Sequence, residues 1–389
     1  MQKKQSHFIQ NDLIILLTLL ICVSLLSIYN AQQLDQYSRN FVILQLIWYM
    51  VGIGFVIGLQ FLDLDQLYKV SFIVYAVTVF LLVVLWLSPE SIARVVNGSK
   101  SWFHLPGFTL QPSEFTKIGL IMYLSALISK HKEKVKNVTV KTDLILLGKI
   151  ILVTLIPFVF TQIQPDLGTS LVYFFIAGVM LVLSGIDWKI LGLLIGTILV
   201  VAVGAVFFVL NFPQFSEDTL GIKPYQMDRI RTWFDPTEQT SDETYQIDRS
   251  LQALGSGQLN GKGLASLQVK LPEAHTDFIF SVVGESFGFI GSAVVIFLFF
   301  LLLYKLVTLG MKVHTYSTFG SYLCFGFMAL ILMHTFQNIG MTLGIMPITG
   351  VPLLFISYGG SSVMSTMLGF GLIYRMAVSY SVQSDYLFK

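Results

Sequence analysis

Charged residues are scarce in this sequence. Asp, Glu, Lys and Arg make up 12% of the 389 residues, whereas hydrophobic residues make up 54%. A soluble domain is usually about one-quarter charged. The chain therefore has too little charge to cover a water-exposed surface, and its composition favours lipid as the surrounding solvent.

The net charge and the number of cysteines are low as well. A formal net charge of +2 provides no strongly basic surface, so we expect no nucleic-acid partner. The two cysteines, Cys22 and Cys324, both lie in apolar runs and are far apart in the sequence. They indicate neither a disulfide framework nor a metal site, and we expect them to be small apolar packing residues.

Long apolar runs are what the sequence does contain. A membrane-spanning helix needs about 20 mostly apolar residues. The sequence predicts an all-α polytopic membrane protein, with residues 1–389 forming a single integral membrane domain. Ten segments qualify as spans. They are 12–30, 41–62, 69–88, 113–130, 144–163, 168–185, 188–211, 276–305, 320–344 and 357–378.

Lysine and arginine gather after the fourth and eighth predicted spans and at both ends of the chain. Cytoplasmic loops of membrane proteins carry an excess of these residues. We therefore predict a multi-pass protein of the bacterial cell membrane with both termini in the cytoplasm. The longest outer loop then covers residues 212–275, between spans seven and eight. The residues that set this orientation are Lys3, Lys4, Lys130, Lys132, Lys134, Lys136, Lys141, Lys305, Lys312, Arg375 and Lys389.

Most of the polar motifs fall on or just below the predicted outer face. They are NGSKSWF, QPSEFTK, QPDLGT, LPEAHTD and ITGVPLLFISYGGSS. Asp277 ends the fourth motif and is followed at once by Phe278 and other apolar residues. This asymmetry is typical of a protein that acts on a substrate at the outer leaflet, so we expect the active site to face outward.

Three further charged residues enter the predicted spans. Glu114 and Lys117 are three residues apart, so their side chains can pair on one helix face. Glu285 lies eight residues beyond Asp277, about 12 Å deeper along a helix. Ionisable residues inside membranes usually face a cavity or a partner. A structural ion pair and a substrate role both remain open for Glu114 and Lys117, and a packing hydrogen bond or a substrate role for Glu285.

The predicted outer rim also suits an anionic headgroup. Spans four, six, eight and ten would begin at this face, and helix N-termini present free N–H groups and positive dipole ends. Lys100, Arg229 and Arg231 would add full charges, although the arginines could simply be solvated. Trp102 follows closely on Lys100 in a turn-rich loop, where its ring could stack on a sugar. Its alternative role is that of an ordinary interfacial tryptophan.

The motifs together resemble the SEDS family of membrane proteins, named for shape, elongation, division and sporulation. The strings that carry the resemblance are NGSKSWF, QPSEFTK, QPDLGT, LPEAHTDFIFSVVGESFGFIG and NIGMTLGIMPITGVPLLFISYGGSS, and they follow the family order over most of the chain. Within the family, the chain looks most like the elongation-type members, RodA, in features that include SPESIA and SGIDWK. The division-type members, FtsW, share most of the motifs.

The resemblance implies ten transmembrane helices and an inverting peptidoglycan glycosyltransferase. Such an enzyme polymerises lipid II at the outer leaflet, here during cell elongation and rod-shape maintenance. It also implies a class B penicillin-binding protein as transpeptidase partner, together with other elongation-complex membrane proteins. The catalytic aspartate of the family carries over to Asp277, and its loop tryptophan to Trp102.

The chemistry gives Asp277 a role, because the 4-hydroxyl that accepts the growing glycan is a poor nucleophile and benefits from a carboxylate base. Whether a divalent cation binds at the diphosphate stays open. The alternatives are a flippase for the lipid-linked precursor, a division-type or sporulation-type polymerase, and a scaffold. The predicted substrate-binding residues are Lys100, Trp102, Glu114, Lys117, Gln164, Asp166, Arg229, Arg231, Glu285, Ser357 and Ser361.

Overall fold

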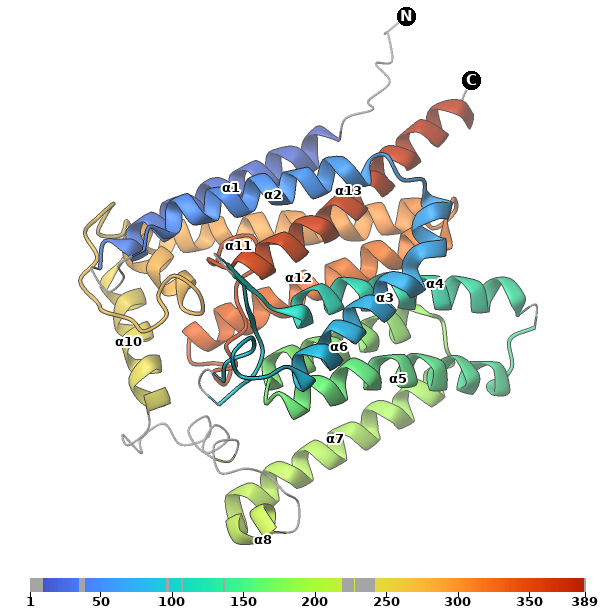
Figure 1. Cartoon of the computed structure of the whole chain (residues 1–389), viewed down its shortest axis with the longest axis horizontal. Coiled ribbons are helices and arrows are strands. Elements are labelled where there is room, and N and C mark those ends of the chain that lie inside the picture. The colour runs from blue at the N-terminus through green and yellow to red at the C-terminus, as the bar shows by residue number, and fades with distance from the viewer. Residues whose placement is uncertain are drawn as a thin grey trace, which may run out of the picture.

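The computed structural model describes residues 10–34, 39–95, 98–105, 108–135, 137–218, 227 and 242–387. In this part of the chain, long helices lie side by side and share one main direction (Figure 1). The helices are α1 (Asn11–Gln32), α2 (Phe41–Leu59), α3 (Leu64–Leu87), α4 (Pro112–Lys134), α5 (Val140–Ile163), α6 (Leu167–Leu183), α7 (Trp188–Asn211), α8 (Pro213–Asp218), α10 (Asp242–Ser256), α11 (Ile279–Val313), α12 (Thr318–Thr342) and α13 (Gly360–Leu387). A short antiparallel hairpin joins β1 (Phe103–Leu105) to β2 (Phe108–Leu110) between α3 and α4.

Each predicted span coincides with one of these helices. Seven of the described helices are long and apolar enough to cross a membrane by length and composition, namely α1, α2, α3, α5, α7, α11 and α12. The α6 helix is apolar but shorter. The chain is accordingly a multi-pass membrane protein. The predicted boundaries were wrong at α3, which begins at Leu64, at α11, which runs on to Val313, and at α13, which runs on to Leu387. Apolarity alone does not detect polar helix ends.

Polar side chains fix where several helices begin. Asn40, Thr139, Asp166, Asp187 and Ser317 each precede a helix and accept a hydrogen bond from a backbone N–H of its first turn. The first N–H groups of a helix have no partner within the helix, so these caps satisfy donors that would otherwise be exposed to lipid.

The α11 helix is broken at Gly288, whose φ of 66° lies in the left-handed region. The segment Gln258–Gly263 packs against the break. The N–H of Phe289 donates to the carbonyl of Gln258 at 2.9 Å, and the N–H of Lys262 donates to the carbonyl of Glu285 at 2.9 Å. A Cβ on Gly288 would lie 2.5 Å from the carbonyl oxygen of Leu259, so only glycine fits here. The break ties the long connecting segment to the membrane helix.

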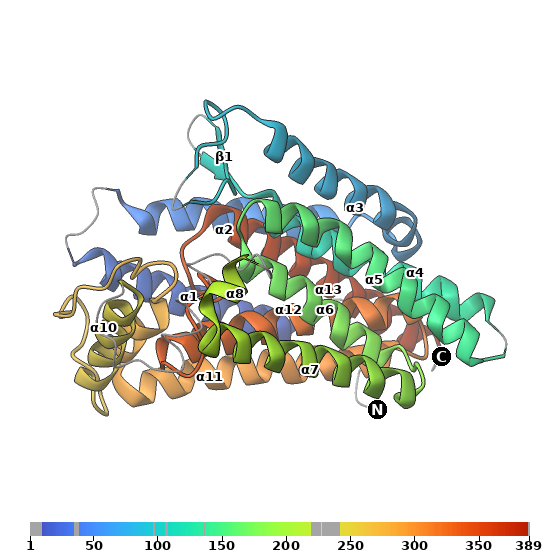
Figure 2. The same ribbon diagram turned by 90° about the horizontal axis from the view of Figure 1, so that it is seen from below.

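The two ends of the described chain meet at one end of the bundle. The side chain of Gln10 donates to the hydroxyl of Ser381 at 2.5 Å, which joins the start of α1 to α13. The hairpin, α10 and the connection from α12 to α13 lie at the opposite end (Figure 1). The α7 helix runs along the outside of the bundle, as the second view shows (Figure 2), and buries few of its side chains.

Candidate active site

A cavity of about 970 Å³ opens at the end of the bundle that carries the hairpin. Its walls come from four places: the start of α2, the segment from Trp102 to Glu114, the residues that precede α11, and the connection between α12 and α13. These segments are far apart in the sequence, so the folded bundle is what brings them together. The cavity is large enough for the sugar of a lipid-linked substrate.

Asp277 lies in this cavity two residues before α11 begins. Its carboxylate forms no hydrogen bond or ion pair with the described residues. Burial raises the pKa of Asp277 to about 7, and the negative charge of Glu273 contributes to this rise in the same direction. An aspartate that is half protonated near neutral pH, with no partner in the described structure, is well suited to exchange a proton with a bound substrate.

The backbone around Asp277 is held firmly by its neighbours. The side-chain amide of Asn338, on α12, donates to the carbonyl of Asp277 at 2.8 Å and to the carbonyl of Val351 at 2.9 Å. The hydroxyl of Ser357 donates to the carbonyl of Thr276 at 2.7 Å and accepts from the N–H of Leu353 at 2.9 Å. The carboxylate is thus free, while the backbone that carries it is fixed from both sides.

The non-helical segment 343–359 forms much of the cavity floor, and side chains of α1 and α2 hold it. Ser24 donates to the carbonyl of Ile356 at 2.8 Å, Gln45 to that of Ser357 at 3.1 Å, and Tyr49 to that of Phe355 at 2.5 Å. Irregular backbone at membrane depth must find its hydrogen bonds within the protein. These three buried side chains meet that need.

Glu114 and Lys117 form the buried ion pair that their spacing predicted, at 2.7 Å. The Nζ of Lys117 also lies 3.1 Å from Nε2 of His334, whose Nδ1 is 2.8 Å from the carbonyl of Pro352. A carbonyl only accepts, so Nδ1 carries the proton and Nε2 accepts from Lys117. Oε2 of Glu114 has no hydrogen-bond partner among the described residues, and Glu114 lines the cavity.

Aromatic rings form one side of the cavity. Trp102, Trp48 and Phe108 all line it, and the rings of Trp48 and Phe108 pack edge to face with centroids 6.0 Å apart. Gly360 lets Trp48 approach the start of α13, because a Cβ there would lie 2.9 Å from the indole ring. Aromatic faces of this kind commonly accept a sugar ring or an apolar chain.

Ser361 and Ser357, both predicted to bind substrate, serve the backbone in different ways. Ser361 lines the cavity, accepts from the N–H of Gln111 at 2.9 Å and donates to the carbonyl of Thr109 at 3.2 Å. It therefore joins α13 to the segment that carries Trp102. Ser357 is not among the cavity residues, because its hydroxyl is turned inward to Thr276 and Leu353.

Three other predicted substrate residues lie outside the cavity wall. Lys100 donates to the backbone carbonyls of Trp86 and Ser88, at the end of α3. Gln164 is buried and donates to the carbonyl of Leu82 at 3.2 Å. Asp166 caps α6 and is 3.4 Å from the amide nitrogen of Gln111. These side chains already have partners, and the sequence could not reveal those long-range contacts.

Glu285 is buried away from the cavity. One of its carboxylate oxygens accepts from Nζ of Lys262 at 2.6 Å and from the N–H groups of Gln268 and Val269 at 2.9 and 3.2 Å. It thereby anchors the connecting segment beside the break in α11, which matches the packing alternative given above. Arg229 and Arg231 lie outside the described residues.

Sequence reasoning missed several residues of the cavity wall. Arg39 and Tyr358 both line it, and the charge of Arg39 acts to lower the pKa of Tyr358, which burial raises. His275 also lines the cavity and stacks on Phe41 with ring centroids 4.2 Å apart. A signal for Arg39 existed, because it stands at the outer start of the second predicted span. Groups of three or more His, Cys, Asp or Glu side chains that could hold a metal ion are absent from the described residues.

Comparison with known proteins finds relatives over nearly the whole chain. A family model described as "cell cycle protein", which covers FtsW, RodA and SpoVE, matches residues 4–382. The probable peptidoglycan glycosyltransferase FtsW of Geobacter sp. (strain M18) is 31% identical over 379 residues, which cover 94% of this chain and 96% of that protein. Stage V sporulation protein E of Bacillus subtilis (strain 168) is 31% identical over 377 residues, which cover 94% and 96%.

Solved structures share the fold. One belongs to a peptidoglycan synthase complex, with a TM-score of 0.71, 25% identity and coverage of 95% of this chain and 97% of that chain. Another is the rod shape determining protein RodA of Thermus thermophilus, with a TM-score of 0.65, 25% identity and coverage of 94% and 95%. The motifs, the helical fold and the match over nearly the whole chain lead to one conclusion: this protein belongs to the SEDS family.

Proposed function

We propose that this protein polymerises lipid II into glycan strands at the outer leaflet of the cell membrane, with Asp277 as general base. The observation that carries the proposal is the free carboxylate of Asp277 in a cavity at the mouth of a membrane helix. Relatives named as peptidoglycan glycosyltransferases support the reaction class. The chain is accordingly an enzyme of the peptidoglycan glycosyltransferase class.

The proposed reaction is a single displacement at the sugar C1 of the donor. Asp277 takes the proton from the 4-hydroxyl of the acceptor, and the oxygen attacks C1 from the face opposite the leaving group. The bond from C1 to the diphosphate oxygen breaks, and undecaprenyl diphosphate leaves with the electron pair, so the configuration at C1 inverts. A base with a pKa near the working pH is the most effective one, and the pKa of Asp277 is raised to about 7.

The other wall residues have roles that fit this reaction. Trp102 and Trp48 would hold a sugar ring or the start of the lipid chain by their faces. Arg39 would attract the diphosphate, since it carries a full charge at the cavity wall and is exposed. Glu114 presents a carboxylate oxygen without a hydrogen-bond partner in the described structure, and this oxygen could accept from a sugar hydroxyl.

The proposal includes ten membrane crossings, both termini in the cytoplasm and the Asp277 cavity facing outward. It also includes a class B penicillin-binding protein as partner, in line with a structural relative that comes from a peptidoglycan synthase complex. We assign the elongation role on the overall sequence similarity. A division or sporulation role is the alternative, because curated relatives include FtsW and stage V sporulation protein E.

The test is polymerisation of lipid II by the purified protein, with and without a candidate transpeptidase. Asp277→Asn keeps the size of the side chain but cannot accept the proton. General-base catalysis contributes about 10²–10⁴-fold, and we expect a rate loss in that range. The matched control is Asp248→Asn, an exposed carboxylate on α10 that does not line the cavity. Glycan synthesis by folded Asp277→Asn at the normal rate would exclude the base and revive the flippase and scaffold alternatives.

The cellular role needs a separate experiment. The gene is expressed in cells depleted of their elongation-type polymerase and, in parallel, in cells depleted of their division-type polymerase. Recovery of rod shape in the first strain alone supports the elongation assignment. Recovery of division alone would place the protein with the division-type members, and the chemistry proposed for Asp277 would be unaffected.

A further inference from the structure

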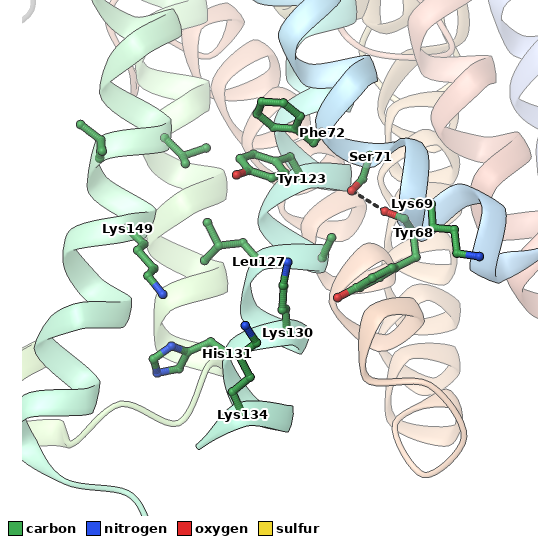
Figure 3. A pocket seen from close by; sticks show the side chains of 13 residues that line it. Tyr68, Lys69, Ser71, Phe72, Tyr123, Leu127, Lys130, His131, Lys134 and Lys149 are labelled. Carbon is green, nitrogen blue, oxygen red and sulfur yellow. Dashed lines mark hydrogen bonds between the residues drawn. The ribbon is translucent and has the colours of Figure 1, made fainter. Parts of the chain in front are cut away.

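A second cavity, of about 610 Å³, lies at the end of the bundle opposite Asp277. It is bounded by α3, α4 and α5 (Figure 3). Glu114 of the active site and Lys130 of this cavity are both on α4, and 16 residues of helix correspond to about 24 Å. This cavity is therefore separate from the site of glycan synthesis.

Cationic side chains dominate its rim. Lys69 comes from α3, Lys130 and Lys134 from α4, and Lys149 from α5, and His131 lies beside the α4 lysines. Lys130, Lys134 and Lys149 extend into the space between α4 and α5, whereas Lys69 points away from them along α3 (Figure 3). None of the four lysines forms an ion pair with a carboxylate in the described part of the chain. Three lysines that face one space without a paired carboxylate form a site for an anion.

Two carboxylates near the rim do not neutralise it. Glu133 accepts from the hydroxyl of Ser129 at 3.2 Å, and Asp143 accepts from the backbone N–H of Asp187 at 3.0 Å. Neither residue lines the cavity. Their hydrogen-bond partners are neutral, so both carboxylates keep their charge, but two negative charges offset the four lysines only in part.

Lys149 is the most informative of the four lysines. It stands nine residues after the first residue of α5, about 14 Å along a helix that is apolar enough to span a membrane. Charged side chains at such depth are costly and usually face a partner. The side chain is exposed and forms no ion pair among the described residues, so an anion from outside the described protein can reach it.

The floor of the cavity is apolar. Tyr123 stacks on Tyr75 with centroids 5.1 Å apart and lies 5.3 Å from the ring of Phe72. Phe72 and Leu152 line the cavity and are also exposed on the outer faces of their helices, so the floor continues onto the surface that faces lipid. A cationic rim above an apolar floor that opens toward lipid matches a molecule with an anionic head and acyl chains.

We propose that this cavity binds an anionic phospholipid of the surrounding leaflet, with its phosphate between Lys149, Lys130 and Lys134 and its acyl chains along Phe72 and Leu152. Basic pockets between membrane helices on the cytoplasmic side are suited to such headgroups. The site goes beyond the polymerase function, because it requires neither lipid II nor Asp277. Bound lipid would fill the space between α3 and α5 and hold these helices against α4.

The experiment is native mass spectrometry of the purified full chain with an equimolar mixture of phosphatidylglycerol and phosphatidylcholine. We expect preferential retention of phosphatidylglycerol. One lysine near an anionic headgroup is worth about 1 kcal/mol, so Lys149→Gln should weaken retention roughly fivefold. Lys149→Arg should keep most of it. The matched control is Lys312→Gln, which removes an exposed lysine in the last turn of α11, away from the cavity.

Removing a charge from a membrane helix does not threaten its insertion, so the variants should fold. Equal retention of the two phospholipids, or no difference between Lys149→Gln and Lys312→Gln, would overturn the proposal. Two further arms identify the anion. Displacement of the lipid by inorganic phosphate alone would show a free-anion site instead. Preferential retention of lipid II would show a precursor site, which would contradict the phospholipid and support the flippase alternative.

Discussion

The side-chain amide of Asn338 is bonded to the backbone of Asp277, at 2.8 Å from its carbonyl oxygen. The second proton of the same amide goes to the carbonyl of Val351, at 2.9 Å. One buried group on α12 thus joins the start of α11 to the floor of the active-site cavity. It sets the position of the carboxylate without touching it.

Asn338→Leu keeps a similar volume but leaves both carbonyls without a donor. Each unsatisfied buried group costs about 1–3 kcal/mol. We expect a lower melting temperature and a fall in the polymerisation rate that exceeds any change in lipid II binding, because Asp277 is displaced from its productive position. Asn211→Leu is the control, since Asn211 is exposed and donates only within α7. Normal activity and stability in Asn338→Leu would show that the bridge has no positioning role.

Burial chiefly raises the pKa of Asp277, and the charge of Glu273 should shift the pH range of activity further in the same direction. A base works only when deprotonated, so activity is present above the pKa of Asp277 and is lost as the pH falls through about 7. Glu273→Gln removes a negative charge that raises this pKa, so the acidic limb of the pH–rate profile should move to lower pH. The hydroxyl of Thr276, which donates to the carboxylate of Glu273 at 3.1 Å, can still donate to the amide oxygen of the variant. An acidic limb that stays at the same pH in Glu273→Gln, or moves to higher pH, would contradict this prediction.

Trp102→Ala should lower polymerisation while the protein level in the membrane stays unchanged. The indole lines the same cavity as Asp277, and its loss removes a stacking face for the substrate. The comparison is Trp86→Ala, an exposed tryptophan at the end of α3 that is not part of the cavity wall. Equal effects of the two substitutions in a glycan assay would support the interfacial role for Trp102.

The pair Glu114 and Lys117 should behave as a unit. Lys117→Met leaves a buried carboxylate without its cation, whereas the double variant, Glu114→Gln combined with Lys117→Met, removes both charges. Breaking a buried pair costs roughly 3–5 kcal/mol, and replacing both partners costs much less. We expect the double variant to have a higher melting temperature than Lys117→Met. A single variant of normal stability that no longer binds lipid II would instead assign the pair to the substrate.

Topology can be read from two exposed positions in a chain whose two cysteines have been replaced by alanine. Cysteine at Val138, after α4, should resist impermeant thiol reagents in intact cells, and cysteine at Leu259, near α11, should react. The reason is the excess of lysine after α4. Labelling of the first position from outside would reverse the orientation and place the Asp277 cavity at the inner face.

Apolar length predicted every long helix, because a membrane helix is defined by a property of its own residues. The break at Gly288 was not predicted, since it depends on a segment that precedes α11 and packs against it. The Glu114–Lys117 pair was predicted from its spacing, whereas His334, 217 residues away, could not be. The spacing of residues in the sequence predicts contacts within one helix, but it does not predict contacts between helices that are far apart in the sequence.

The site followed the same rule. Asp277 and Trp102 stood in recognisable motifs, and both line the cavity. Lys100 and Gln164 stood in motifs as well, yet their side chains serve backbone carbonyls nearby. A polar residue in a motif can bind substrate or support the residues that do, and only its partners in the fold distinguish the two.

The support of the cavity floor by the first two helices has a consequence for biosynthesis. Ser24, Gln45 and Tyr49 are separated by 332, 312 and 306 residues from the carbonyls they bind. A ribosome adds roughly 5–20 residues per second, so these polar groups enter the membrane about 15–65 s before their partners exist. During that time these side chains in the nascent chain either lack a hydrogen-bond partner or form hydrogen bonds to a chaperone or to water. The floor of the Asp277 cavity therefore closes only after most of the chain has been synthesised.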